Sequence, residues 1–529
     1  MMKRDLRAVA MAVGLGLGAL LGTAPARAED TVLKWGDNLT VSLDPHALYD
    51  VNIAFIRLNA YDTLFRYDGN PPEIKPDLAE SYTVSPDGKD WLFALRKGVK
   101  FHDGNELTSS DVVYSFRRVL GLNKATAGAF KPILKPDNIT AEGPYAVRMR
   151  LDTAYAPFLA ALPIVAIVNQ KLLEAHTVVQ DGKSDWGEPF LSAADAGSGA
   201  FKVVPGSFSP LDKVDLAWFP DYFLGWPEKH LTIIKARMIK ETSTRVLAIS
   251  KGEIDVTDSY IPADQLERLS KTAGVRVTHN EIMRIFLIRM NNQRPPFDNL
   301  HFRRALSYAF NYRGFIENVK HNNATRNPGP IPVTLWGAPA DLKGYDFDLD
   351  KAKAELALAK QDGCDFSREF DIEPQSDLEE SVMAAQLYQS DLLKLGLKPR
   401  IVKKLWANLS TEAGKAETAP DMWLHWISAY FIDPENWIGQ AYDSRFHGTW
   451  KASSWYKNPK VDDLLTRARE SLDQPTRKQL YEAASRLIVD DAVDVWIYNT
   501  VEQRAMRTRV EGAMFSPVGT IEARNIHLE

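Results

Sequence analysis

The stretch Lys251-Gly252-Glu253-Ile254-Asp255-Val256-Thr257-Asp258-Ser259-Tyr260-Ile261-Pro262 decides the fold of this chain. A second informative stretch begins about thirty residues later and reads Met290-Asn291-Asn292-Gln293-Arg294-Pro295-Pro296-Phe297-Asp298-Asn299-Leu300-His301-Phe302-Arg303-Arg304-Ala305-Leu306. Neither resembles a catalytic motif. The first lies between two segments whose apolar spacing predicts helices, and the second follows an apolar run that predicts a strand.

Strand and helix patterns alternate along the rest of the chain. Short apolar or alternating runs predict strands at 32–35, 91–95, 145–151, 201–204, 233–239, 282–289 and 493–498. Helical periodicity predicts helices at 109–120, 243–251, 262–270, 302–310, 350–360, 378–395, 460–472 and 475–489. Mixed elements of this kind favour the α/β class.

The N-terminus has the layout of a secretory signal peptide. Lys3, Arg4 and Arg7 precede an apolar run at 8–22, and Ala26-Arg27-Ala28 follows it. We expect residues 1–28 to be removed by cleavage near Ala28. The alternative is a transmembrane anchor, but the run is short against the roughly 20 residues that span a bilayer. The single cysteine, Cys364, provides no lipid anchor near this site and no disulfide. These features predict a protein of the Gram-negative periplasm.

The composition argues against several functional classes. A net charge of −5 gives no indication of nucleic-acid binding. The common hydrolase, zinc-protease and P-loop motifs are absent, and the ten histidines show no pair at metal-helix spacing. Glu379-Glu380 lies on an amphipathic segment, where a solvated face is expected. We therefore predict no enzyme, no metal and no cofactor. A secreted hydrolase of unfamiliar geometry and a chaperone-like binder of unfolded chains are the alternatives.

Several motifs, in the right order, resemble one transport family. They are the two stretches above, 42–46 (Ser-Leu-Asp-Pro-His), 61–65 (Tyr-Asp-Thr-Leu-Phe), 76–81 (Pro-Asp-Leu-Ala-Glu-Ser), 93–104, 197–201 (Gly-Ser-Gly-Ala-Phe) and 433–437 (Asp-Pro-Glu-Asn-Trp). Together they resemble the oligopeptide- and dipeptide-binding proteins, family 5 of the extracellular solute-binding proteins that serve peptide-type ABC importers. The resemblance runs from about residue 35 to residue 498.

The resemblance implies an α/β, two-lobed periplasmic-binding-protein fold with an extra side domain, which makes three interleaved domains. The first lobe would contain residues 29–66, 187–280 and 498–529. The side domain would contain 67–186, and the opposing lobe 281–497. The chain would cross between the lobes twice, near 281–292 and near 496–500, and these crossings would form the hinge.

The resemblance also implies partners and a site. The protein would be a monomer that captures a small solute or peptide by hinge closure, and it would deliver the solute to ABC permease subunits that work with separate ATPase subunits. No nucleic acid and no membrane insertion are implied. The expected ligand contacts are Tyr49, Asp258, Ser259, Tyr260, Arg284, Phe286, Trp406, Trp423, Trp426 and Tyr430.

Two positions distinguish this chain from the peptide binders it resembles. Those proteins usually carry an aspartate four residues before the proline of the late Asp-Pro motif, where it holds the peptide amine. Here that position is Tyr430.

Alternation along 282–290 places Arg284, Phe286 and Ile288 on one face. A buried guanidinium needs an anionic partner, which is either a protein carboxylate or the ligand. Two solute classes stay open: a peptide or peptide-like compound, and an anionic or polyol-bearing non-peptide such as an opine, sugar conjugate or chelate.

Overall fold

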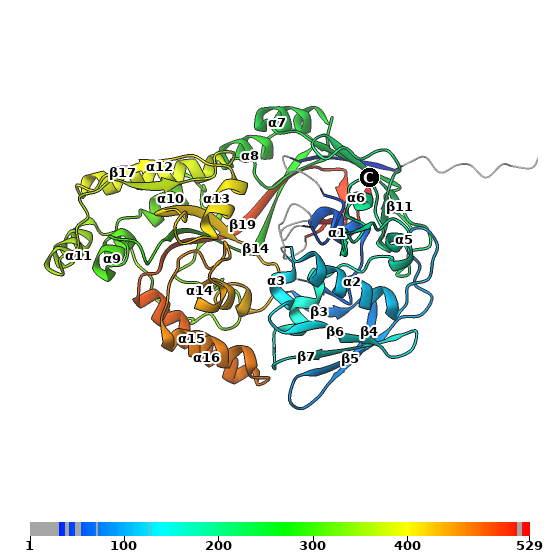
Figure 1. Cartoon of the computed structure of the whole chain (residues 1–529). Helices are drawn as coiled ribbons and strands as arrows, with labels where there is room; N and C mark the ends of the chain where they lie inside the picture. Colours follow the sequence, from blue (N-terminus) through cyan, green and yellow to red (C-terminus); the bar gives the residue numbers. More distant parts are fainter. Residues whose placement is uncertain (1–30, 38–41, 48–53, 70–71, 125, 516–520) are drawn as a thin grey trace, which may run out of the picture. The chain divides into compact units, whose positions relative to one another are not determined.

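The computed structural model describes residues 31–37, 42–47, 54–69, 72–124, 126–515 and 521–529 (Figure 1). The predicted signal peptide and Tyr49 lie outside these residues. Thr31–Glu529 forms one compact unit. It mixes helices with one large sheet and several small ones, so the predicted α/β class is confirmed.

The large sheet has eleven strands drawn from distant parts of the sequence. Ten of them lie in the order β10 (Phe201–Val203), β11 (Lys213–Trp218), β12 (Ile233–Met238), β1 (Val32–Asp37), β13 (Val256–Thr257), β19 (Asp494–Arg507), β14 (Val275–Met290), β18 (Met422–Ile427), β16 (Phe370–Glu373) and β17 (Pro399–Ile401). The eleventh, β15 (Ala324–Arg326), pairs with β19.

Two long antiparallel strands, β14 and β19, form the middle of this sheet (Figure 1). Near one end of the pair β13 bonds to β19, and at the other end β18 bonds to β14. The ladder is interrupted between the pairs Glu281–Val501 and Ile285–Asn499, so that three residues of β14 face one residue of β19. Such a bulge bends a strand and redirects its side chains. The two predicted crossings fall on these strands, although the division into lobes stays a prediction.

The later side chains of β14 alternate between two buried clusters on opposite faces of the strand. Phe286, Ile288 and Met290 belong to one buried cluster with the helices α9 (Leu300–Tyr308) and α12 (Glu379–Lys394) and with β18. Ile285 and Leu287 belong to a second cluster on the other face, with the helices α15 (Pro459–Glu470) and α16 (Gln474–Asp490). Because successive side chains of a strand point to opposite faces, a strand buried on both sides reads as a continuous apolar run.

A second, four-stranded antiparallel sheet lies within the predicted side domain. Its order is β4 (Ala79–Val84), β5 (Asp90–Leu95), β7 (Ala146–Leu151) and β6 (Leu134–Ala141). Helix α2 (Ser109–Leu122) packs against β6 and β7. At the start of α2 the carboxylate of Asp111 accepts a hydrogen bond from the backbone N–H of Thr108 at 2.8 Å, as in a capping box.

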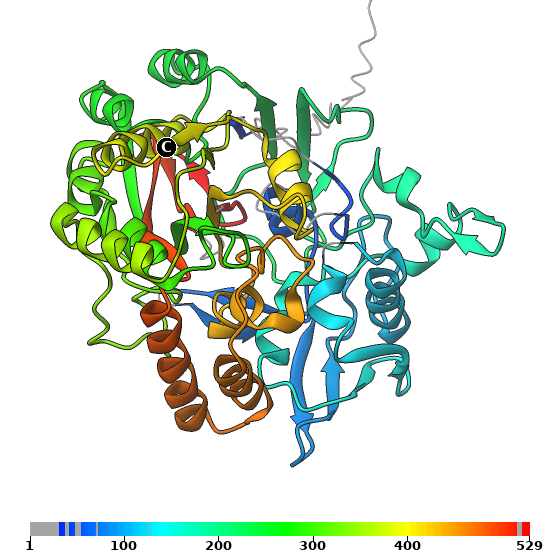
Figure 2. The ribbon, with the colours of Figure 1, turned by 60° about the vertical axis from the view of Figure 1, so that its left-hand side comes forward.

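Helix α3 (Ala127–Phe130) packs with the four-stranded sheet. The helices around the large sheet are α1 (Ala54–Ala60), α7 (Thr242–Lys251), α8 (Ala263–Ser270), α9 (Leu300–Tyr308), α10 (Tyr312–Asn318), α11 (Leu349–Gln361), α12 (Glu379–Lys394), α13 (Trp406–Ala413), α14 (Gly439–Tyr442), α15 (Pro459–Glu470) and α16 (Gln474–Asp490). Figure 2 shows α15 and α16 lying side by side. No described helix is both long enough and apolar enough to span a bilayer.

Every predicted helix is present to within a few residues at each end. The predicted strands are present too, but two were predicted too short. The run at 282–289 is part of a sixteen-residue strand, β14, and the run at 493–498 is the start of a fourteen-residue strand, β19. Their extra residues are mostly polar or charged, so the apolar pattern used for the prediction does not continue into them.

Candidate ligand-binding site

A cavity of about 350 Å³ lies against the two long strands and is here called the main cavity. One wall comes from residues 240–266, around the starts of α7 and α8. The other comes from residues 318–321, from the first turn of α12 and from β18. Arg284 of β14 and residues 500–503 of β19 line it between these walls. Both walls therefore meet at the interrupted part of the ladder.

The bulge in β14 positions Arg284. Its side chain is only 8% exposed and lines the main cavity. Its nearest polar contacts are long: Nε lies 3.5 Å from the hydroxyl of Thr500, and Nη1 lies 3.4 Å from that of Tyr260. The guanidinium carbon lies 5.5 Å from the centre of the Tyr260 ring. No carboxylate of a described residue forms an ion pair with Arg284, which leaves a nearly buried cation facing the cavity.

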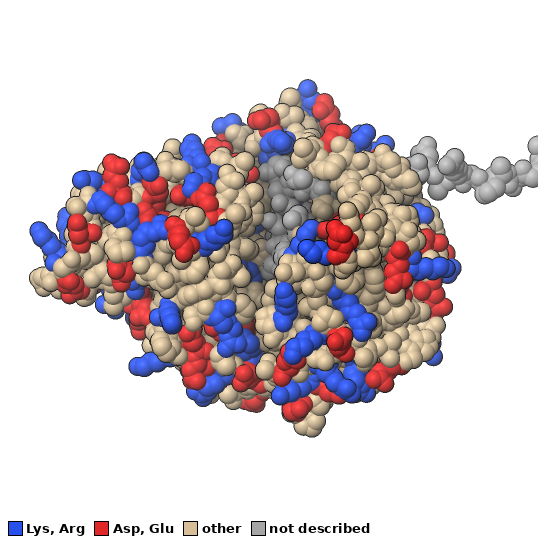
Figure 3. All heavy atoms as spheres, viewed as in Figure 1, with Lys and Arg blue, Asp and Glu red and all other residues tan. Residues whose placement is uncertain are grey.

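Two other charged residues of the cavity are compensated within the protein. Lys320 forms an ion pair with Glu380 at 2.7 Å, and Glu502 forms one with Arg504 at 2.9 Å. The hydroxyl of Tyr498 donates to the second oxygen of Glu380. Burial, reinforced by this carboxylate, raises the pKa of Tyr498 well above its ordinary value, so the phenol stays protonated. On the face shown in Figure 3, basic and acidic side chains are interspersed.

The three consecutive residues predicted after β13 have different surroundings. Ser259 and Tyr260 line the main cavity. Asp258 is 1% exposed, and its carboxylate lies 2.5 Å from Nε of Arg245. Burial, with a contribution from Asp37, raises the pKa of Asp258 to about 6, while Arg245 acts in the opposite direction. The structure thus places Asp258 behind the wall, paired inside the protein.

The predicted aromatic contacts form two separate groups. In the first, Trp426 lines the main cavity and donates from Nε1 to the hydroxyl of Tyr498 at 3.1 Å. Phe286 lies beneath it, with the ring centres 4.4 Å apart. Since Phe286 is fully buried in the core, it supports Trp426 and does not itself line the cavity.

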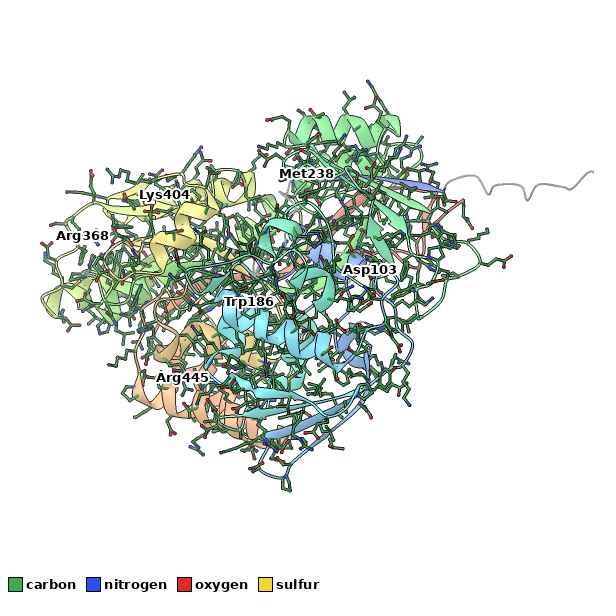
Figure 4. All side chains as sticks on the ribbon, turned by 45° about the vertical axis from the view of Figure 1, so that its right-hand side comes forward. Asp103, Trp186, Met238, Arg368, Lys404 and Arg445 are labelled. Atoms are coloured by element: carbon green, nitrogen blue, oxygen red, sulfur yellow. The ribbon has the colours of Figure 1, made fainter. Side chains whose placement is uncertain are left out.

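The second group lies on the opposite face of β18. Trp423 stacks on His425 with centres 4.0 Å apart, and Trp406 lies 5.9 Å from Trp423. Trp450 contacts Trp406 at 5.1 Å and Tyr430 at 6.4 Å. Because neighbouring residues of a strand point to opposite faces, Trp423 and Trp426 cannot reach one site. Lys404, labelled in Figure 4, precedes this group and forms ion pairs with Glu373 and Glu412.

Tyr430 has a basic neighbour. Nζ of Lys451 lies 4.4 Å from the centre of its ring and donates at 2.8 Å to side-chain oxygens of Asn436 and Gln440. Burial lowers the pKa of Lys451 well below its ordinary value, and Glu435 opposes this shift. Tyr430 also packs in the same buried cluster as the side-domain residues, although it belongs to the predicted opposing lobe.

Comparison with known proteins identifies the family. The family model described as bacterial extracellular solute-binding proteins, family 5 middle, matches residues 73–448. The chain belongs to this family. It is 30% identical over 485 residues to the probable D,D-dipeptide-binding periplasmic protein DdpA of Escherichia coli, with 90% of each chain covered. It is 27% identical to heme-binding protein A of Haemophilus influenzae over 477 residues, covering 87% of this chain and 85% of that protein.

Solved structures of family 5 proteins share the fold. The periplasmic binding protein DppA of Helicobacter pylori, in complex with the peptide STSA, has a TM-score of 0.82 and 26% identity. The match covers 94% of this chain and 99% of that one. The dipeptide-binding protein of Pseudoalteromonas, in complex with Met-Leu, has a TM-score of 0.82 and 25% identity, covering 94% and 100%. The predicted periplasmic-binding-protein fold is confirmed.

Sequence reasoning missed part of the candidate site. Lys320, Glu380 and Tyr498 form a polar network beside Trp426, yet Glu379-Glu380 was expected to be a solvated face. Arg245, the partner of Asp258, was not singled out either. The sequence contains one signal for Glu380. It lies in the first turn of a predicted helix, where the helix dipole favours carboxylates.

Proposed function

We propose that this family 5 protein captures a peptide or peptide-like solute and delivers it to the permease of an ABC importer driven by separate ATPase subunits. Its relatives support the proposal: one is named a probable D,D-dipeptide-binding protein, and the similar structures contain the peptides STSA and Met-Leu. We further propose that the protein acts as a monomer in the periplasm after signal-peptide cleavage near Ala28, and that it carries out no catalysis.

The observation that carries the proposal is Arg284, a nearly buried cation that faces a cavity of about 350 Å³ with no carboxylate partner among the described residues. A solute carboxylate would supply the missing charge through a charge-assisted hydrogen bond. Ser259, Tyr260 and Trp426 would complete the contact surface, since all three line the cavity. The volume lies at the lower end of typical ligand sites, which favours a small solute.

Hinge closure is the proposed mechanism. The two walls of the main cavity come from the predicted first lobe and the predicted opposing lobe, and both meet at β14 and β19. His321 of one wall lies 3.4 Å from Glu267 of helix α8 on the other side. We expect scattering to give a smaller radius of gyration with saturating solute. An unchanged radius in the presence of a bound solute would count against closure.

A second solute class is favoured by the surroundings of Tyr430. The peptide binders that this chain resembles hold the peptide amine with an aspartate at the equivalent position, and here the ammonium of Lys451 lies 4.4 Å from the tyrosine ring. A tyrosine at this place offers a peptide ammonium no negative charge to pair with. The alternative solute is therefore an anionic or polyol-bearing non-peptide such as an opine, sugar conjugate or chelate.

One experiment separates the two classes. Di- to pentapeptides and acidic non-peptide solutes are titrated calorimetrically into the wild-type protein and into Arg284→Ala. Tight binding of ordinary peptides that is weakened in the variant supports the peptide proposal. Binding of acidic non-peptides alone, again weakened in the variant, replaces it with the alternative. Tight peptide binding that is equal in both proteins would remove Arg284 from the site.

A further inference from the structure

Two buried side chains of opposite charge line the main cavity without pairing with each other. Arg284 of β14 is 8% exposed, and Glu502 of β19 is 1% exposed. Both belong to the described residues, and no ion pair joins them. The strands that carry them run side by side (Figure 1). A solute that carries both charges could therefore provide each side chain with a partner of opposite sign.

One carboxylate oxygen of Glu502 is used inside the protein and the other is not. Oε1 accepts a hydrogen bond from Nη2 of Arg504 at 2.9 Å. Oε2 is buried and has no hydrogen-bond partner among the described residues. Because a buried carboxylate oxygen without a donor is unfavourable, this oxygen suits a donor that the solute brings.

The other carboxylates that line the cavity suit this role less well. Glu380 has both oxygens engaged within the protein. Asp264 is half exposed and paired with an arginine of its own helix. Asp377 and Glu379 are exposed, so water competes there for a cation. Among the described residues of the cavity, Glu502 is thus the carboxylate that is both buried and partly unused.

The spacing of the two charges fits a short zwitterion. Nε of Arg284 lies 3.5 Å from the hydroxyl of Thr500, which places the guanidinium beside that residue of β19. Thr500 and Glu502 are alternate residues of the strand, so they share one face and lie about 7 Å apart along it. An extended dipeptide spans at most about 7 Å. Its carboxylate can therefore reach Arg284 while its ammonium reaches Glu502.

We propose that Glu502 holds the α-ammonium of a short zwitterionic solute of the dipeptide kind, whose carboxylate is held by Arg284. This inference rests on the proposed function, because it concerns the same cavity and selects the peptide class of solute. Glu502 supplies the negative charge that peptide binders obtain from an aspartate where this chain has Tyr430. The second crossing strand then sets the requirement for a free amine.

Calorimetry on the full chain tests the contact by changing the solute and the protein in turn. The probe is Ala-Ala, used as the L,L and the D,D compound. Its counterpart, N-acetyl-Ala-Ala, keeps the carboxylate and lacks the ammonium. The wild type should bind the preferred Ala-Ala isomer at least about tenfold more tightly than its acetylated form.

The variant Glu502→Gln keeps the shape of the side chain and removes its charge. It should bind Ala-Ala about tenfold or more weakly than the wild type does, and it should bind N-acetyl-Ala-Ala with unchanged affinity. The unchanged affinity for the acetylated probe also shows that the variant is folded. The matched control is Glu281→Gln, an exposed position of β14 outside the cavity, which should change neither affinity.

A measurement on the wild type keeps the proposal testable if Glu502→Gln does not fold. The ordinary pKa of an α-amino group is about 7.7–8.0, so at pH 8.5 most free Ala-Ala has lost its ammonium proton. A carboxylate partner favours the charged form of the amine. Binding of Ala-Ala at pH 8.5 should therefore take up about half a proton or more, measured by calorimetry in buffers of different ionisation enthalpy. N-acetyl-Ala-Ala should take up none.

Three results would overturn the proposal while the peptide role stands, because the probe still binds in each. They are equal affinity of Glu502→Gln and the wild type for Ala-Ala, equal affinity of the wild type for Ala-Ala and its acetylated form, and binding of Ala-Ala at pH 8.5 without proton uptake. If neither Ala-Ala nor any other di- to pentapeptide shows saturable binding to the wild type, the proposed function fails together with this inference.

Discussion

The guanidinium of Arg289 and the carboxylate of Asp494 form an ion pair at 2.9 Å between the two long strands, and both side chains are completely buried. The hydroxyl of Tyr442 donates to the same carboxylate at 2.7 Å. This pair joins β14 to β19 at the end of the ladder that lies beside β18. It therefore holds the two crossing strands together on the side of the bulge where β18 lies.

Arg289→Met should be strongly destabilising. The substitution leaves the carboxylate of Asp494 buried without its cation, which costs about 3–5 kcal/mol in the free energy of unfolding. Urea unfolding followed by circular dichroism measures the loss. The matched control is Arg237→Met, which breaks a partly exposed pair with Asp215 and should cost less than about 1 kcal/mol. Equal losses in the two variants would contradict the structural role given to Arg289.

Arg284→Ala should weaken solute binding and leave the free energy of unfolding nearly unchanged. Arg284 has only long polar contacts within the protein, so its removal should change the free energy of unfolding by less than about 1 kcal/mol. Solute binding should weaken by about 1.5–3 kcal/mol, the value of a hydrogen bond to a charged group. Calorimetry and urea unfolding on the same preparations test both parts, with the exposed Arg313→Ala as control. A large loss of stability with unchanged affinity would assign Arg284 a structural role.

Acid should destabilise the protein through His46. This side chain is buried, accepts from Arg118 at 3.0 Å and donates to the carbonyl of Ala166 at 2.8 Å. Burial and the charge of Arg118 lower its pKa to about 4 from an ordinary value of 6.5. Below pH 6.5 the unfolded state therefore binds the proton first. The resulting stability, about 3 kcal/mol at neutral pH, is lost as the pH falls through 4.

The test of His46 compares variants across pH. Unfolding free energies of the wild type and of His46→Gln are measured between pH 4 and pH 7. The advantage of the wild type over the variant should shrink as the pH falls. His176→Gln, at an exposed position, should follow the wild type at every pH. A constant difference between wild type and His46→Gln would refute the assignment.

Gly199→Ala should strongly destabilise the protein. A Cβ at this position would lie 2.4 Å from the carbonyl carbon of Ala60 and 2.5 Å from the backbone nitrogen of Tyr61. Backbone atoms cannot move aside as a flexible side chain can, so the expected cost is about 3 kcal/mol or more. Gly128→Ala is the control, since its Cβ meets nothing within 4 Å. Thermal unfolding distinguishes the two, and a wild-type midpoint for Gly199→Ala would disprove the contact.

The elements of the fold were predictable because their signals are local. The capping carboxylate of Asp111 and the Pro475 that opens α16 can both be read within four residues of sequence. The alternation that groups Arg284 with Phe286 is also local, and it is correct. Alternation does not predict how deeply each side chain is buried. Phe286 is covered by Trp426, whereas Arg284 reaches the cavity because of the bulge.

The candidate site was only partly predictable because its contacts join distant segments. Asp258 was expected to face the solute, but its partner Arg245 lies on a helix earlier in the chain and turns the carboxylate inward. Trp423 and Trp426 are close in sequence and lie on opposite faces of β18. Glu380 and Tyr498 are in contact although more than a hundred residues separate them in the sequence, and no local pattern predicts that contact.

The bulge in β14 also constrains the length of the chain. Three residues there oppose Thr500 alone, the pairing before the bulge is regular, and a second register shift follows between Phe286 and Leu287. A substitution at 284 changes one side chain. A deletion of one residue between 281 and 285 would instead turn every later side chain of the strand to the other face, moving Phe286 and Ile288 out of their cluster. The strand therefore tolerates replacement of the side chain at 284 more readily than a change in the number of residues in the crossing.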